Sequence, residues 1–251
     1  MEAVFIKLLN MSIAASWLIF AVMVLRALLK NAPKNIRRIL WALVGIRLVL
    51  PFSPESFLSL IPSAETVSPD ILYAETPEIH SGISAFNTYV NPLISESLAP
   101  AAYASVNPIQ VVAYIASVVW IAGMISLVLY SVISYVRLRR RVADAVIFWD
   151  NFWQSEKVAS PFVLGLFRPR IYLPFGMDEE SLAYVIAHEQ AHISRRDHWI
   201  KPFGFLLLTV YWFNPLIWLA YILLCRDIEL ACDERVVMQM DADDKKAYSK
   251  A

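Results

Sequence analysis

The chain has 251 residues, of which 58% are hydrophobic and 18% are charged, and its mean hydropathy is +0.53. Such an apolar composition excludes an ordinary soluble domain and is typical of a membrane protein. The formal net charge is zero and no basic face is interleaved with aromatic residues, so direct nucleic-acid binding is not expected.

Three apolar segments are candidate transmembrane helices. Residues 8–25 are free of charge and long enough to cross a bilayer. Residues 36–52 form a shorter candidate that contains Arg47, and either a contact to another element or a position near the outer interface would account for this arginine. Residues 111–136 form the third and clearest candidate, so the sequence predicts three spans.

The basic residues around these segments predict their orientation. They cluster after the first and third candidates, at Lys30, Lys34, Arg37, Arg38, Arg137, Arg139, Arg140 and Arg141. By the positive-inside rule both clusters lie in the cytoplasm, whereas residues 53–107, which contain no Lys or Arg, lie outside. We expect this Pro-, Ser- and Ala-rich region to be an irregular extracytoplasmic loop that either contacts a ligand or serves as a tether.

Downstream of the third span the sequence predicts a hairpin followed by a helix. The apolar runs at residues 162–164 and 171–173 flank a turn-prone stretch with Gly165 and Pro169. The hairpin would provide an edge strand for an extended substrate, or would be purely structural. Asp178 is a suitable N-terminal cap for the helix that follows.

The predicted helix carries the sequence His188-Glu189-Gln190-Ala191-His192, an HExxH motif. Positions i and i+4 share one face of a helix, so both imidazoles can reach one Zn²⁺. Glu189 lies between them and is the expected general base, which takes a proton from a zinc-bound water. An accidental histidine pair on a solvated helix is the alternative.

A third zinc ligand is expected from Glu229. Residues 202–225 before it are free of charge and would by themselves indicate a fourth span. A single crossing would place Glu229 and the histidines on opposite sides of a bilayer about 30 Å thick. Asn214-Pro215 near the middle favours a helix break, so we expect a re-entrant or interfacial helical hairpin, with a simple span as the alternative.

Two aspartates are candidates to orient the ligands. Asp233 lies one helical turn after Glu229 and is expected to accept the free N–H of a ligand histidine. Asp197 would either orient a ligand or cap the next helix. The alternative for Glu229 and Asp233 is a solvated acidic face paired with Arg226 and Arg235.

Three other residues with metal-binding side chains are expected to be structural. His198 would be a fourth ligand in a set that already has three, so it is expected to be structural or interfacial. Cys225 and Cys232 would lie about 10 Å apart on one helix, which is too far for a disulfide. Both are therefore interpreted as small buried apolar residues.

Together these elements predict a mainly α membrane protein with three transmembrane helices and a cytoplasmic α+β zinc metallopeptidase domain. Residues 1–52 hold two spans and their basic cytoplasmic loop, residues 53–107 form the outer loop, and residues 108–136 form the third span. Residues 137–251 form the zinc domain, which includes the membrane-dipping hairpin at residues 202–225.

Four stretches of the chain form a specific combination: SPFVLGLFRPRIYLP, HEQAH followed by ISRRD, WFNPLIW, and RDIELACDE. With the order of the spans, they resemble the BlaR/MecR family of membrane metallopeptidases over almost the whole chain. The resemblance implies a gluzincin-type zinc endopeptidase in the bacterial cytoplasmic membrane, with its active site on the cytoplasmic side. By the motifs, His188, His192 and Glu229 are ligands and Glu189 is the catalytic acid/base.

In the best-known members of this family, a β-lactam acylates an extracytoplasmic sensor domain. The zinc domain then cleaves itself or a cytoplasmic transcriptional repressor. The expected partners are therefore the lipid bilayer and a protein substrate of this kind, with a homodimer as a possible assembly. This chain departs from those members because it stops at Ala251 and has no Ser-x-x-Lys motif, so a fragment or a sensorless member is expected.

Two other functions compete with regulated signalling. One is a quality-control membrane zinc protease of the HtpX type, which a downstream sensor domain or a neighbouring repressor gene would argue against. The other is a non-catalytic receptor in which zinc only stabilises the cytoplasmic lobe. Glu189 argues against the receptor, because a structural zinc site needs no base and closes its fourth position.

Overall fold

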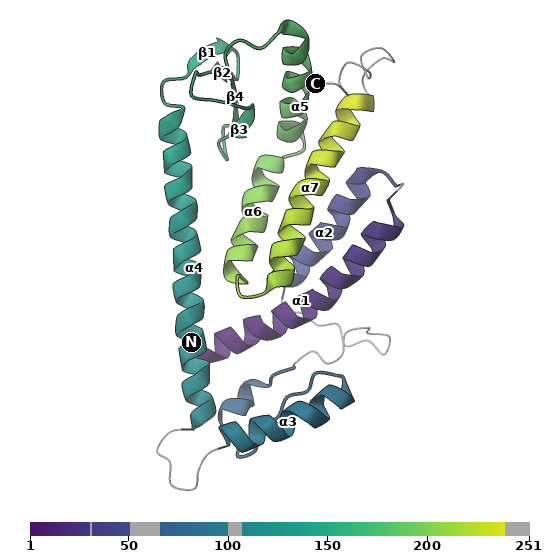
Figure 1. The fold of residues 1–251 in the computed structure, drawn as a ribbon, viewed down its shortest axis with the longest axis vertical. Helices are drawn as coiled ribbons and strands as arrows, with labels where there is room; N and C mark the ends of the chain where they lie inside the picture. Colours follow the sequence, from purple (N-terminus) through teal and green to yellow (C-terminus); the bar gives the residue numbers. More distant parts are fainter. Residues whose placement is uncertain (31, 51–65, 100–106, 239–251) are drawn as a thin grey trace. The chain divides into compact units, whose positions relative to one another are not determined.

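The computed structural model describes residues 1–30, 32–50, 66–99 and 107–238. The chain divides into two compact units, one of residues 1–30, 40–126 and 209–220, the other of residues 31–39, 127–208 and 221–251. The described residues are mainly helical, as the sequence predicts, and a small β-sheet belongs to the second unit (Figure 1).

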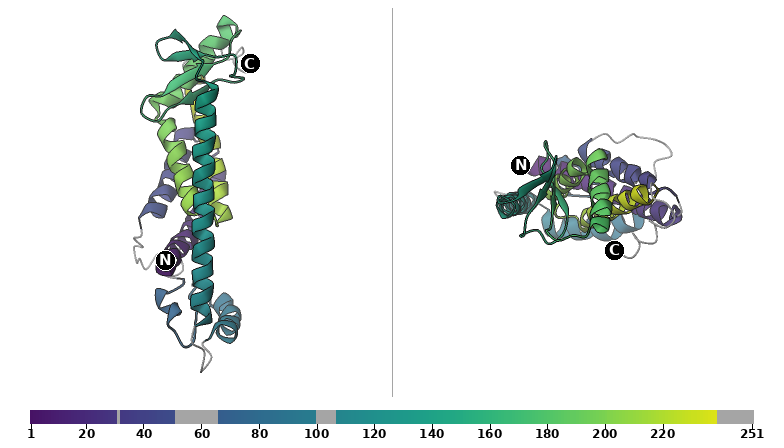
Figure 2. Two further views of the ribbon diagram at one scale, coloured as in Figure 1. Left: turned by 90° about the vertical axis from the view of Figure 1, so that its left-hand side faces the viewer. Right: turned by 90° about the horizontal axis from the view of Figure 1, so that it is seen from above.

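Within the described residues, two helices are long and apolar enough to cross a membrane, α1 (Glu2–Leu28) and α4 (Pro108–Arg141). They contain the predicted spans at residues 8–25 and 111–136, and α4 is a single unbroken helix (Figure 2). The second predicted span, residues 36–52, corresponds to α2 (Lys34–Val49), whose 16 residues measure about 24 Å. Residues 51 and 52 of that prediction lie outside the described part of the chain.

The predicted outer loop contains more regular structure than expected. Within residues 66–99, a 3-10 turn, η1 (Pro69–Leu72), precedes a 15-residue helix, α3 (Ser84–Leu98). The expectation of an irregular loop is wrong for this part, because α3 accommodates Pro92 in its interior. Residues 53–65 and 100–106 of the predicted loop lie outside the described residues.

The chain reverses direction after α6 (Asp197–Val210) and returns as α7 (Pro215–Met238), as Figure 1 shows. The break falls at Asn214-Pro215, as the sequence predicts. Gly204 of α6 allows the close approach of α7, since a Cβ built there would lie 3.2–3.3 Å from Tyr221 and Leu224. Residues 202–225 therefore form two helices of a hairpin.

Hydrogen bonds hold the turn of this hairpin within the first unit. The indole N–H of Trp120 donates to the Val210 carbonyl, and that of Trp212 donates to the Trp120 carbonyl. Gly123 leaves the room for Trp212, because a Cβ there would lie 2.2 Å from its ring. The amide of Asn214 donates to Ser12 and Ser16 of α1, at 2.7 and 2.8 Å. Side chains thus bond some of the backbone carbonyls that the break exposes.

The sheet has four short strands, β1 (Val146–Trp149), β2 (Phe152–Gln154), β3 (Phe162–Leu164) and β4 (Arg170–Leu173), in the order β1-β2-β4-β3. The pair β3–β4 is the predicted antiparallel hairpin, which is confirmed. Gly165 begins its turn at a φ of 114°, a conformation that side chains rarely adopt. Because β3 pairs with β4 alone, it is an edge strand of the described sheet.

The helix α5 (Glu179–Ser194) begins where the sequence predicts, with the side chain of Asp178 accepting a hydrogen bond from the Ser181 amide at 2.9 Å. One side of α5 packs on the buried sheet residues Ile171 and Leu173. Its other side packs on Cys232 and Val236 of α7. Seen from above, α5 therefore lies between the sheet and α7 (Figure 2, right).

Candidate metal centre

The two histidines of the HExxH motif project from adjacent turns of α5. Their rings are 4.8 Å apart, and the Nε2 atoms of His188 and His192 approach each other to 3.1 Å. This approach follows from the helical repeat, which places residues i and i+4 on one face. Both Nε2 atoms are thus directed towards a common point.

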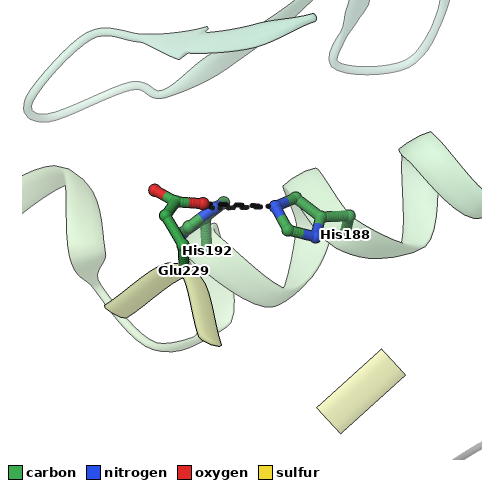
Figure 3. Close-up of side chains that lie close together, drawn as sticks. All are labelled: His188, His192 and Glu229. Atoms are coloured by element: carbon green, nitrogen blue, oxygen red, sulfur yellow. Dashed lines mark hydrogen bonds and ion pairs between the residues drawn. The ribbon is translucent and has the colours of Figure 1, made fainter. Parts of the chain in front are cut away.

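The return of the chain in α7 brings Glu229 to the same point (Figure 3). Its Oε2 atom lies 3.2 Å from Nε2 of His192 and 3.5 Å from Nε2 of His188. The carboxylate and the imidazoles are separated along the chain by the whole α6–α7 hairpin. The hairpin is therefore what assembles this group of side chains.

These three side chains fit a zinc ion. Each offers one ligand atom, and the three atoms lie 3.1–3.5 Å from one another. Tetrahedral ligands at 2.0–2.1 Å from Zn²⁺ lie roughly 3.3–3.4 Å apart. The donor set of two imidazoles and one carboxylate also matches a catalytic zinc site with a fourth position open for water.

Each histidine is held from its other nitrogen by an aspartate. Nδ1 of His192 lies 2.9 Å from Oδ2 of Asp197, and Nδ1 of His188 lies 3.2 Å from Oδ1 of Asp233. Since a carboxylate only accepts, an Nδ1–H of His192 would donate to Asp197, and Asp233 lies within reach of Nδ1 of His188, so Nε2 of each ring can bind a metal. Both expected histidine–aspartate contacts are thus present, and Asp197 also provides the first residue of α6.

The two aspartates differ in their surroundings. Asp197 is 1% exposed, and the guanidinium groups of Arg38 and Arg195 lie 3.9 and 3.7 Å from its carboxylate. Asp233 has 45% of its side chain exposed. The charge of Asp197 is therefore little screened by solvent, and its contact with His192 is the stronger of the two.

Glu189 is 8% exposed and follows His188 directly in the chain. Burial raises the pKa of Glu189, although the nearby histidines act in the opposite direction. A carboxyl group whose pKa is shifted towards neutrality is suited to accept and return a proton during a reaction.

The histidine–carboxylate contacts also shift pKa values of the ligands. Burial opposes the charged form of His192, but hydrogen bonds with Asp197, Cys232 and Glu229 outweigh it and raise its pKa to about 11. Hydrogen bonds from His188 and His192 hold the pKa of Glu229 well below its usual range. A metal ion binds neutral imidazole, so its binding would displace the proton from His192.

Sequence reasoning missed Lys201, whose Nζ atom donates to Oε1 of Glu229 at 2.6 Å. This bond occupies the oxygen of Glu229 that does not face the histidines, and so it fixes the direction of Oε2. No local pattern marks Lys201, because only the packing of α6 against α7 brings it to Glu229.

The contact of Cys232 with the site was also missed. Its Sγ lies 3.2 Å from Nδ1 of His192 and 3.4 Å from Oδ2 of Asp197, and the three form a second potential metal-binding group. That group is fully buried, so it has no open position for water or substrate. The expected role of Cys232 as a small buried residue is confirmed, because it packs in an apolar cluster with Ala191 and Val236. Both cysteines are free, but Cys225 is only partly buried, so the expectation of burial is wrong for it.

The side chains of Glu229 and Asp233 are each 45% exposed, and each contacts a histidine of the HExxH motif. Glu229 contacts the two histidines and Lys201, and Arg235 donates to the hydroxyl of Ser194 at 3.0 Å. His198 lies outside the group formed by His188, His192 and Glu229, as expected. Burial lowers the pKa of His198, which favours its neutral form.

Comparison with known proteins finds relatives of this chain. The regulatory protein BlaR1 of Bacillus licheniformis is 38% identical over 102 residues, covering 39% of this chain and 16% of the relative. The methicillin resistance mecR1 proteins of Staphylococcus aureus and Staphylococcus epidermidis are 21% identical over 240 residues, covering 84% of this chain and 39% of each relative. The matched part of the chain thus spans well under half of these relatives.

The family model described as BlaR1 peptidase M56 matches residues 6–251. This match includes both histidines of the HExxH motif, the hairpin and Glu229. Because it covers nearly the whole sequence, the chain belongs to the BlaR1 peptidase M56 family.

Proposed function

We propose that this protein is a membrane-embedded zinc endopeptidase in which His188, His192 and Glu229 bind the metal. The observation that carries the proposal is the convergence of two Nε2 atoms and one carboxylate oxygen within 3.1–3.5 Å, beside the buried Glu189. A gluzincin-like active site is the arrangement that this donor set supports.

In the proposed reaction Zn²⁺, when bound, supplies a Lewis acid that lowers the pKa of water and polarises a carbonyl group. Glu189 accepts a proton from the attacking water and passes it to the nitrogen of the leaving amine. Asp197 and Asp233 keep the Nδ1–H tautomer of the two histidines and fix the planes of their rings. Lys201 holds the Oε1 atom of Glu229 and so keeps Oε2 directed towards the histidines.

The edge strand β3 is the proposed binding surface for the substrate backbone. Its outer side has no partner strand among the described residues, and α5, which carries the HExxH motif, packs beside it. An extended peptide can pair with such an edge through main-chain hydrogen bonds. This arrangement favours the substrate-binding interpretation of the hairpin over a purely structural one.

We also propose that residues 36–52 are a membrane span in addition to α1 and α4, and that the metal centre lies on the cytoplasmic side. The basic residues after α1 and at the end of α4 support this orientation. The hairpin at residues 202–225 then dips into the bacterial cytoplasmic membrane from that side and returns. The indole N–H groups of Trp120 and Trp218 donate to the turn carbonyls of Val210 and Trp212, and such bonds allow a re-entrant hairpin.

The proposed substrate is a cytoplasmic repressor or the protein itself, cleaved in transmembrane signalling. The relatives support this choice, because their names describe a regulatory protein and methicillin resistance. Quality control and a non-catalytic receptor receive no comparable support, and the buried Glu189 beside the ligand set argues for catalysis.

Metal removal tests the proposed function. The purified protein, embedded in lipid nanodiscs, should contain about one zinc per chain and should cleave itself or a co-purified repressor. A chelator should abolish cleavage, and stoichiometric Zn²⁺ should restore it. Elemental analysis and gel electrophoresis provide the two measurements. Cleavage that persists in a metal-free preparation would rule out the proposal.

The two aspartates should differ in their effect on zinc affinity. Asp197→Asn removes a buried carboxylate from His192, and we expect a loss of affinity of about 10- to 100-fold. Asp233→Asn removes a half-exposed carboxylate from His188 and should have a smaller effect, because solvent can replace it. Competition with a fluorescent zinc chelator measures both. Equal effects would contradict the stronger role of Asp197.

A further inference from the structure

A cleft of 810 Å³ lies beside the candidate metal centre in the second unit. Its walls come from the end of α4, the β3–β4 hairpin and the first turns of α6. Lys201 lines the cleft and also donates to Glu229, so the cleft adjoins the proposed zinc ligands. Its volume is within the usual range for a ligand-binding pocket, roughly 300–1,000 Å³.

The cleft combines apolar walls with a concentration of positive charge. Its apolar side chains include Val163, Leu164, Leu166 and Phe167. Four cationic side chains line it, from Arg139, Arg168, Arg170 and Lys201, and none of the described residues that line it is acidic. The cleft is therefore electrostatically complementary to an anionic, partly apolar ligand.

Two of the four cations are already engaged. Lys201 is bonded to Glu229, and the guanidinium of Arg170 lies 4.4 Å from the ring centre of Trp153. Arg139 and Arg168 are exposed, and neither makes an ion pair with another described residue. These two arginines are free to form charge-assisted, bidentate hydrogen bonds with a carboxylate.

We propose that the cleft selects peptide substrates with an acidic side chain near the scissile bond, recognised by Arg139 and Arg168. This inference rests on the proposed peptidase function. A peptide paired with the edge strand β3 continues into the cleft, because Val163 and Leu164 of β3 are among its lining residues. A lipid phosphate would also be attracted by the arginines, but the edge strand and the contact between Lys201 and Glu229 favour a peptide.

Peptide binding to the full chain in nanodiscs of zwitterionic lipid tests the inference, with Glu189→Ala to prevent cleavage. Fluorescent peptides that differ only in Asp or Lys at one scanned position are compared by anisotropy at fixed ionic strength. At one scanned position, we expect the peptide with Asp to bind about tenfold more tightly than the peptide with Lys. Arg139→Glu and Arg168→Glu should each reduce this preference or invert it. Arg140→Glu, on the same helix but outside the cleft, should leave it unchanged.

Equal binding of the Asp and Lys peptides at every position would overturn the inference. The inference would also fail if the preference for the Asp peptide survived both charge reversals while the two variants retained less of an added anionic lipid. The cleft would then be a lipid site. Zinc-dependent cleavage by the unmodified chain is measured separately. If cleavage occurs without charge selection, only this inference fails. If charge selection is found without cleavage, the cleft assignment stands and the proposed function fails.

Discussion

Replacing Glu189 by alanine should abolish proteolysis and leave zinc bound. Glu189 is buried beside the ligand set, and no other carboxylate of the described residues follows a ligand histidine in the same way. Loss of a general base typically reduces the rate by about 10²- to 10⁴-fold. The three ligand atoms belong to other residues, so the zinc content should remain near one per chain. Single-turnover cleavage and elemental analysis of one preparation measure both.

The neighbouring variant Gln190→Ala is a matched control, because Gln190 is exposed on the same turn of α5. It should keep both zinc and activity. Unchanged cleavage by Glu189→Ala would contradict the assigned base. Loss of zinc together with activity would show that Glu189 acts through the integrity of the site and not as a base.

Replacing Glu229 by alanine should remove most of the bound zinc. Two imidazoles remain, but a zinc site with only two protein ligands lacks the donor set of known catalytic sites. The loss of affinity should exceed the roughly 10- to 100-fold effect of removing an outer hydrogen-bond partner. Lys201 would also lose its carboxylate partner and add an uncompensated positive charge near the metal. Chelator competition measures the affinity.

Glu234→Ala is the corresponding control on the same helix. Its carboxylate accepts a hydrogen bond from the Lys34 amide at 2.8 Å, so its removal should leave zinc binding unchanged. If Glu229→Ala retained full zinc affinity, the α7 carboxylate would not be a ligand. The hairpin would then have no role in assembling the site.

Local sequence patterns predicted the parts of the site that depend on helix geometry. The spacing of His188 and His192 determines their common face, and Asp233 follows Glu229 by one turn for the same reason. Glu229 itself was predicted by a different argument, since a zinc site with an open position needs a third protein ligand. That requirement also predicted the reversal of residues 202–225, which the α6–α7 hairpin confirms.

Contacts between different helices could not be predicted from local sequence patterns. Lys201 reaches Glu229 only through the packing of two antiparallel helices, and Cys232 contacts His192 through the packing of α5 on α7. Arg38 approaches Asp197 from the first turns of α2, far away in the sequence. The helix α3 was missed because prolines and serines in this region indicate loops, although its helical hydrogen bonds tolerate Pro92.

X-ray absorption spectroscopy at the zinc edge tests the central claim most directly, because it identifies the ligand atoms of the metal in the intact protein. The account predicts a shell of nitrogen and oxygen at about 2.0–2.1 Å, with the scattering pattern of two imidazoles and no sulfur. The competing group of His192, Asp197 and Cys232 would add a sulfur scatterer at about 2.3 Å. A sulfur ligand, or a protein without zinc after purification in zinc-containing buffer, would contradict the assignment of His188, His192 and Glu229.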